Sequence, residues 1–184
     1  MVAPVIRLAL KAFAVCGALL TLTACATASL PAKMTAAPGT VAAATPGDKA
    51  YKALRVANVQ GGSETNPLLA SDVSNADFRL ALEASLRQIE YLAADQDGAF
   101  LITASIVDLQ QPFAGLDMSV TAKVRYTVVP AGGGAPIYDE TLATTGTATM
   151  GDAFMGVERL RMANEAAVKG NIETFIKKLS AALR

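Results

Sequence analysis

The segment from Met118 to Val128 alternates apolar and polar side chains without a break, and no other part of the chain restricts the fold as strongly. The apolar members are Met118, Val120, Ala122, Val124, Tyr126 and Val128, and the polar members between them are Ser119, Thr121, Lys123, Arg125 and Thr127. Successive side chains of a strand point to opposite faces of its sheet. The alternation therefore predicts a strand of a mostly antiparallel sheet, with one face on the core and the other in water.

Three more strands are expected around this one. The glycines that follow Pro130 permit a reversal, so the Thr-rich stretch 136–150 should return as the second arm of an antiparallel hairpin. Apolar positions also alternate over 100–109 and, less regularly, over 52–60. Each of these two stretches predicts a short strand.

Two amphipathic helices complete the pattern. Ser74 and Asp77 offer the reciprocal caps of a helix start, and apolar residues then recur every three or four positions over 75–94. A second helix is predicted over 154–183, with core positions at Leu160, Ala163, Ala167, Phe175, Leu179 and Leu183. Charges of alternating sign recur at a spacing of four along another face of this helix, which predicts a solvated stripe. The members of the stripe are Arg161, Glu165, Lys169, Glu173 and Lys177.

The resulting order β-α-β-β-β-α predicts a single α+β domain over residues 51–184. Both helices should pack on the face of the sheet that carries Met118, Val120 and Val124. These 184 − 50 = 134 residues are within the usual size of one domain with one core.

The first 24 residues have the three parts of a secretory signal peptide. Arg7 and Lys11 form a basic start, positions 12–22 form an apolar run of 11 residues, and small residues precede Cys25. A helix that spans a bilayer needs roughly 17 to 25 apolar residues, so this run is too short for a permanent span. The order predicts secretion and removal of residues 1–24.

Residues 22–25, with the sequence LTAC, resemble the lipobox of bacterial lipoproteins, in which the cysteine takes a diacylglycerol and then a further acyl chain such as palmitate. The resemblance implies that Cys25 is the lipidated first residue of the mature protein, held stably to a membrane. By the sorting rule of such proteins, Ala26 implies the outer membrane, with the domain facing the periplasm. The alternative is cleavage at an ordinary site near Ala24 or Ala28, which leaves Cys25 lost or free.

The segment that joins this cysteine to the domain has the composition of a flexible linker. Residues 25–50 are rich in Ala, Thr, Pro and Gly and have no sustained periodicity, which predicts a disordered tether. Without the signal peptide the chain has 16 − 2 = 14 basic residues against 16 acidic ones, which gives no basic field for nucleic acid. Cys16 leaves with the signal peptide, so no pair of thiols remains for a disulfide.

The residue types also restrict the chemistry. The chain has no histidine and its one mature cysteine is acylated, which excludes Ser-His-Asp and Cys-His catalysis and imidazole or thiolate metal sites. Asp95 with Asp97 and Asp139 with Glu140 are the close acidic pairs for acid–base work or a hard cation. Both pairs fall at expected turns or strand ends, so we expect no catalytic residue, metal or other cofactor.

The connection 112–116 is unusually apolar for a loop. A connection between two strands normally faces water and has little reason to hold Phe113 and Leu116. These two side chains are the candidate binding site for a partner or a lipid acyl chain. The alternative is that they fold back over the end of the core, beside Phe154 and Met155.

Three short stretches carry a family resemblance. They are Gly61-Gly62 with Thr65-Asn66-Pro67, Gln111-Pro112 with Gly115-Leu116-Asp117, and the run from Arg159 to Glu165. Together they resemble a family of small uncharacterised proteobacterial lipoproteins, sometimes labelled UDP-N-acetylglucosamine acyltransferase. That label implies a helix of six-residue repeats and a histidine base, and this chain has neither. The element order resembles the LPS-assembly-lipoprotein fold and the N-terminal domain of the Tol-system β-propeller protein.

These features predict a non-catalytic outer-membrane lipoprotein that assists cell-envelope assembly or transport by binding a protein, glycan or lipid partner. One alternative is an enzyme of envelope glycolipid or peptidoglycan metabolism that uses carboxylates alone, and it needs two acidic groups in one pocket with raised pKa values. Another alternative is a periplasmic lipid carrier, which needs an apolar cavity between the helices and the sheet.

Overall fold

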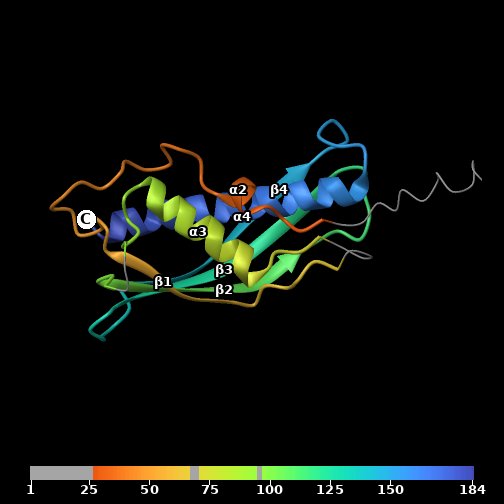
Figure 1. The fold of residues 1–184 in the computed structure, drawn as a ribbon. Coiled ribbons are helices and arrows are strands. Elements are labelled where there is room, and N and C mark those ends of the chain that lie inside the picture. The colour runs from red at the N-terminus through yellow and green to blue at the C-terminus, as the bar shows by residue number, and fades with distance from the viewer. Residues whose placement is uncertain (1–26, 67–70, 95–96) are drawn as a thin grey trace, which may run out of the picture.

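The domain is built on one four-stranded sheet (Figure 1). The computed structural model describes residues 27–66, 71–94 and 97–184. The strands are β1 (Leu54–Gln60), β2 (Phe100–Gln110), β3 (Met118–Pro130) and β4 (Tyr138–Ala148), and they lie side by side in chain order. β1 runs parallel to β2, whereas β2–β3 and β3–β4 are antiparallel pairs. The predicted α+β class and the mostly antiparallel sheet are confirmed.

The alternation in β3 has the predicted physical origin. Its apolar side chains from Val120 to Val128 are buried, and the hairpin pairs Met118 with Ala148. On the opposite, wet face the Thr121 and Thr145 hydroxyls lie 2.8 Å apart across the pair. Cross-strand pairs of this kind hold the register of a hairpin.

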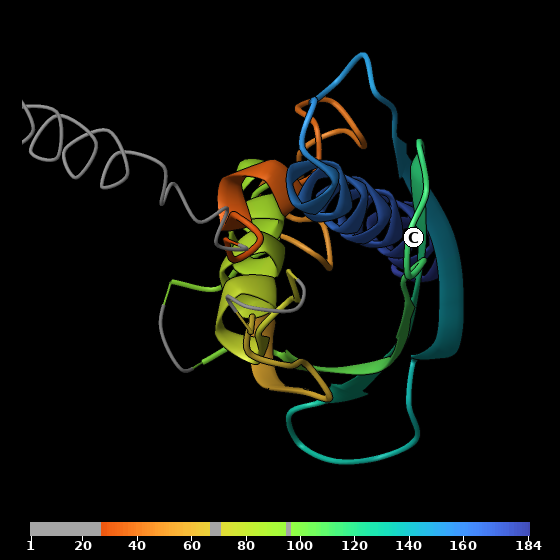
Figure 2. The same cartoon turned by 90° about the vertical axis from the view of Figure 1, so that its right-hand side faces the viewer.

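Both long helices, α3 (Asn75–Gln88) and α4 (Gly156–Ala182), cover the same face of the sheet, as predicted (Figure 2). The Ser74 hydroxyl caps α3 by accepting from the Asp77 backbone N–H at 3.1 Å. The helix ends earlier than the predicted position 94. Glu90 has a φ of 57°, and the chain after it turns to pair with β1, where Leu54 donates to the Tyr91 carbonyl at 2.9 Å.

The core between α4 and the sheet is filled by aromatic side chains. The Tyr126 ring stacks on Phe175 with centroids 4.0 Å apart, and Phe78 lies at 6.4 Å from Tyr126. The Tyr126 hydroxyl donates to the Asn171 Oδ1 at 2.9 Å, and the Asn171 side-chain amide donates to the Ala122 carbonyl at 3.2 Å. This buried polar contact is satisfied, so it specifies how the helix sits on the sheet at little energetic cost.

The main difference from the sequence prediction is that residues 27–50 are not a disordered tether. Within residues 27–50 the chain forms a short helix, α2 (Pro31–Met34), and packs across both long helices, with Met34 fully buried. The Ala36 N–H donates to the Ser85 hydroxyl of α3 at 2.9 Å, and the Ala37 N–H donates to the Glu173 carboxylate of α4 at 2.9 Å. Composition does not predict this packing, because one methionine and a few backbone donors provide the contact rather than a periodic pattern.

The predicted solvated stripe on α4 is wrong for the same reason. Glu165 is buried, because the N-terminal segment covers it and the Leu30 N–H donates to its carboxylate at 2.8 Å. Arg161 donates to both Glu165 and Glu158 and is mostly shielded from water. The N-terminal segment therefore bonds to two members of the stripe, Glu165 and Glu173, while Lys177 at its end is exposed.

The signal peptide, Cys25 and Ala26 lie outside the described residues. Among the helices that the structure does describe, none is long and apolar enough to cross a bilayer.

Candidate functional site

Two loops lie at the end of the molecule where α4 begins (Figure 1). Both loops expose large apolar side chains. One is the β2–β3 connection, where Phe113 is fully exposed and Leu116 is 74% exposed. The other joins β4 to α4, where Phe154 is 86% and Met155 is 46% exposed. We call these four side chains the apolar rim; Figure 2 looks onto the end that carries them.

The alternative interpretation of Phe113 and Leu116 was that they fold back over the end of the core, and the structure does not show this. The core at this end is already closed by Met118, Ala148 and Leu160, which are all buried. The core is therefore covered there without Phe113 and Leu116, which stay exposed. Single exposed apolar residues are ordinary, whereas several on two adjoining loops mark an interaction site.

Arg159, in the first turn of α4, ties the two loops together. Its guanidinium donates to the Phe154 carbonyl at 2.7 Å and the Ala153 carbonyl at 2.9 Å in one loop, and to the Gly115 carbonyl at 3.3 Å in the other. The side chain is buried. Hydrogen bonds from a charged donor are stronger than neutral ones, so Arg159 holds the backbones of the two loops together.

The base of the β2–β3 loop is fastened by a second set of contacts. Gln111 donates through its side-chain amide to the Ser71 carbonyl at 2.9 Å and to Asn164 Oδ1 at 3.1 Å. Asn164 in turn donates to the Ser71 carbonyl at 2.8 Å. Burial raises the pKa of the neighbouring Asp72 carboxyl above its ordinary value. The loop therefore rises from an ordered, buried polar base.

The second loop is closed by its own turn. The Thr149 backbone N–H and hydroxyl donate to the Asp152 carboxylate at 2.7 and 2.8 Å. These two hydrogen bonds lower the pKa of Asp152. The β4–α4 loop is thus bonded internally, and the β2–β3 loop is held by Arg159 and by the contacts of Gln111, which favours a preorganised binding surface.

Of the two acidic pairs that the sequence offers, the structure describes both members of one, Asp139 with Glu140, and cationic side chains engage both of them. Asp95 lies outside the described residues, and Asp97 is exposed. Asp139 accepts two hydrogen bonds of 2.8 Å from Arg125, and Glu140 accepts from Lys178 and from the Tyr138 hydroxyl.

These partners lower the pKa of both Asp139 and Glu140, the opposite of what a general acid at neutral pH requires. Within the described ranges no three Cys, Asp or Glu side chains group as metal ligands do.

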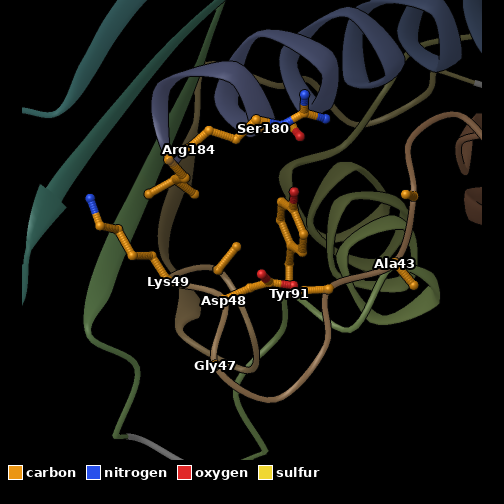
Figure 3. A pocket seen from close by; sticks show the side chains of 11 residues that line it. Ala43, Gly47, Asp48, Lys49, Tyr91, Ser180 and Arg184 are labelled. Atoms are coloured by element: carbon orange, nitrogen blue, oxygen red, sulfur yellow. The ribbon is translucent and has the colours of Figure 1, made fainter.

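A cavity of about 440 Å³ lies at the opposite end of α4, between the 42–50 segment, Tyr91 and the last turn (Figure 3). The Tyr91 hydroxyl points into it, whereas the Lys49 side chain points away. The Asp48 carboxylate that lines it accepts from the Thr45 N–H at 2.7 Å. This cavity is not between the helices and the sheet, where the lipid-carrier alternative places one; that space holds the Tyr126, Phe175 and Phe78 side chains.

Similarity to known proteins is found in the fold and not in the sequence. The sequence matches no known family model, and no curated protein is significantly similar to it. A candidate lipoprotein from Caulobacter crescentus has a similar structure, with a TM-score of 0.51 and 11% sequence identity over 73% of this chain and 92% of its own. A protein from Xanthomonas campestris assigned to the family DUF330 gives a TM-score of 0.53 and 7% identity over 85% of this chain and 96% of its own.

At such low identity these likenesses show a shared fold and nothing about function. The described α+β fold has no helix of six-residue repeats, in agreement with the missing repeat in the sequence. The acyltransferase label and the likeness to the LPS-assembly-lipoprotein fold are not confirmed.

Sequence reasoning missed the role of Arg159. A usable signal was present, because the first turn of a helix disfavours a cation through the helix dipole. An arginine in that turn requires a compensating contact, and here the contact is with carbonyls of the two rim loops.

Proposed function

We propose that the protein is a lipid-anchored lipoprotein of the outer membrane, facing the periplasm, that acts by binding rather than by catalysis. The apolar rim is its binding surface. The observation that carries the proposal is the outward presentation of Phe113 and Phe154 on two loops that Arg159 joins. An exposed apolar surface of this kind lowers the solubility of a protein. Burial of that surface against a partner removes this disadvantage.

The proposed anchor is the lipid on Cys25, which places the domain beside a membrane and suits a role in cell-envelope assembly or transport. The structural similarity to the candidate lipoprotein from Caulobacter crescentus supports the anchor. An enzyme that uses carboxylates alone has less support, because Asp139 and Glu140 are engaged by cations and their pKa values are lowered.

The anchor is tested first, by metabolic labelling with palmitate and by the mass of the mature N-terminal peptide. We expect the label and an acylated Cys25 in the membrane fraction, and loss of both in Cys25→Ser. An unmodified cysteine, or cleavage near Ala28, would show that the anchor is absent.

The binding surface is tested by photo-crosslinking in cells, with a crosslinking amino acid at position 113 and, separately, at position 107. Val107 is 59% exposed on β2, outside the rim, and serves as the matched control. We expect a specific adduct from position 113 that Phe154→Ala weakens, and none from position 107. Equal adducts from both positions would contradict the rim as the binding surface.

A further inference from the structure

The N-terminal segment determines how far the anchor can lie from the domain. Leu30 is held to Glu165 on α4, and the Ser29 N–H donates to the Asp72 carbonyl at 3.5 Å. Leu30 lies five positions after Cys25, and a chain extends by at most ~3.6 Å per residue. The anchored cysteine therefore lies within about 18 Å of Leu30, whatever path residues 26–29 take.

This reach includes one end of the molecule and excludes the other. Along α4, the first residue, Gly156, lies nine residues before Glu165, or about 14 Å at 1.5 Å per residue. Ala182 lies 17 residues after Glu165, or about 26 Å away. An anchor within about 18 Å of Leu30 reaches the level of the apolar rim but not the C-terminal end. In Figure 1 residues 27–30 enter from the same side as the two rim loops.

The charge of this end agrees with contact by apolar burial rather than by electrostatic attraction. Two exposed acidic residues, Asp117 and Asp152, adjoin the rim in sequence, while Arg159, which joins the two rim loops, is buried beneath them. Acidic residues are repelled by anionic headgroups, so electrostatic attraction of the kind that a basic patch provides does not explain membrane contact at this end. Aromatic and aliphatic side chains on loop tips instead partition into the boundary between headgroups and acyl chains.

From the reach of the anchor and the position of the rim, we infer that the apolar rim docks into the same bilayer leaflet that holds the lipid of Cys25. The partner that covers Phe113, Leu116, Phe154 and Met155 is thus the acyl-chain boundary of the membrane itself. This inference rests on the proposed function and names the occupant of its binding surface. It also gives the domain a fixed orientation, with α4 pointing away from the membrane and the cavity near Tyr91 at the distal end.

The test uses the absence of tryptophan from the sequence, so that one substitution introduces one fluorophore. Phe113→Trp and Phe154→Trp, and the control Val107→Trp, are purified with lipid on Cys25 verified by mass and are reconstituted into phosphatidylcholine vesicles with brominated acyl chains. We expect strong quenching and a blue-shifted emission for the two rim variants, unchanged at high salt, and neither effect for the control. Each fluorophore replaces an exposed side chain, and thermal unfolding verifies that the fold is kept.

Each other result has a defined meaning. Rim fluorescence no more quenched than that of Val107→Trp overturns membrane docking, and so does quenching that high salt abolishes. If docking fails while position 113 still crosslinks to one specific protein in cells, the rim remains a binding surface and its occupant is a protein. If docking and crosslinking both fail, the proposed function fails with them.

Discussion

Leu30 donates its backbone N–H to the buried carboxylate of Glu165 at 2.8 Å, across 135 residues of sequence. This contact turns what composition presents as a loose linker into part of the domain, because a buried carboxylate needs donors and the N-terminal segment supplies one. Arg161 supplies the opposite charge from the same helix. In the arrangement that we propose, the distance between the anchor and the domain, and hence the orientation of the domain, depends on this contact.

The N-terminal segment should contribute to stability. Met34→Ala removes a fully buried side chain and should lower the free energy of unfolding by about 2 to 4 kcal/mol. Lys33→Ala, at the exposed neighbouring position, should change it by less than about 0.5 kcal/mol. Denaturant unfolding of the mature chain measures both. Equal, small effects would mean that residues 27–50 are a tether after all.

Arg159 should control the order of the rim. Arg159→Met keeps the length of the side chain but removes the donors to Ala153, Phe154 and Gly115. We expect amide exchange in both rim loops to become faster by roughly tenfold, since one lost charged hydrogen bond is worth about 1.5 kcal/mol. Arg125→Met, which removes an exposed ion pair on the outer face of the sheet, is the control and should leave exchange in these loops unchanged. Unchanged exchange in Arg159→Met would show that the loops are ordered without it.

Gly146 should not tolerate a side chain. A Cβ at this position would lie 2.3 Å from the Ala167 backbone nitrogen and 2.5 Å from the Ala163 carbonyl oxygen, so α4 must move away from β4. Gly146→Ala should therefore cost about 1 to 3 kcal/mol, as overpacking does. Gly132→Ala, in the open β3–β4 turn, meets nothing within 4 Å and is the control. A thermal unfolding midpoint equal to that of the wild type would show that the helix sits further from the sheet.

The Glu158–Arg161 pair should make stability depend on pH in the acidic range. The hydrogen bond from Arg161 lowers the pKa of Glu158 below its ordinary 4.5. A carboxyl whose pKa is lower in the folded state stabilises the fold above its unfolded pKa, and this contribution disappears as the pH falls through the folded value.

The free energy difference between wild type and Glu158→Gln should therefore be about 0.3 to 1 kcal/mol near neutral pH and shrink toward zero below 4.5. Denaturant titrations at several pH values measure it, with the exposed Glu64→Gln as the control. A difference that grows in acid would contradict the assignment of the pair.

Much of the candidate site followed from residue type alone. Phe113 and Leu116 were selected because they are apolar in a loop, and they are exposed. Phe154 and Met155 were expected only as a cover for them, and instead they extend the same surface. Local sequence does not show which loops of a domain lie next to one another. It therefore could not predict that Arg159 joins the two rim loops.

The sequence by itself determined the strands, the two long helices, the face of the sheet that is buried and the chemistry that missing histidines exclude. These properties follow from the side-chain periods of strands and helices and from residue type, which are local. The tertiary structure decided where residues 27–50 lie, how α3 ends, and that the rim and the N-terminal segment share one end. These depend on single contacts between distant residues, such as Leu30 with Glu165 and Arg159 with Gly115, and no periodic pattern records such contacts.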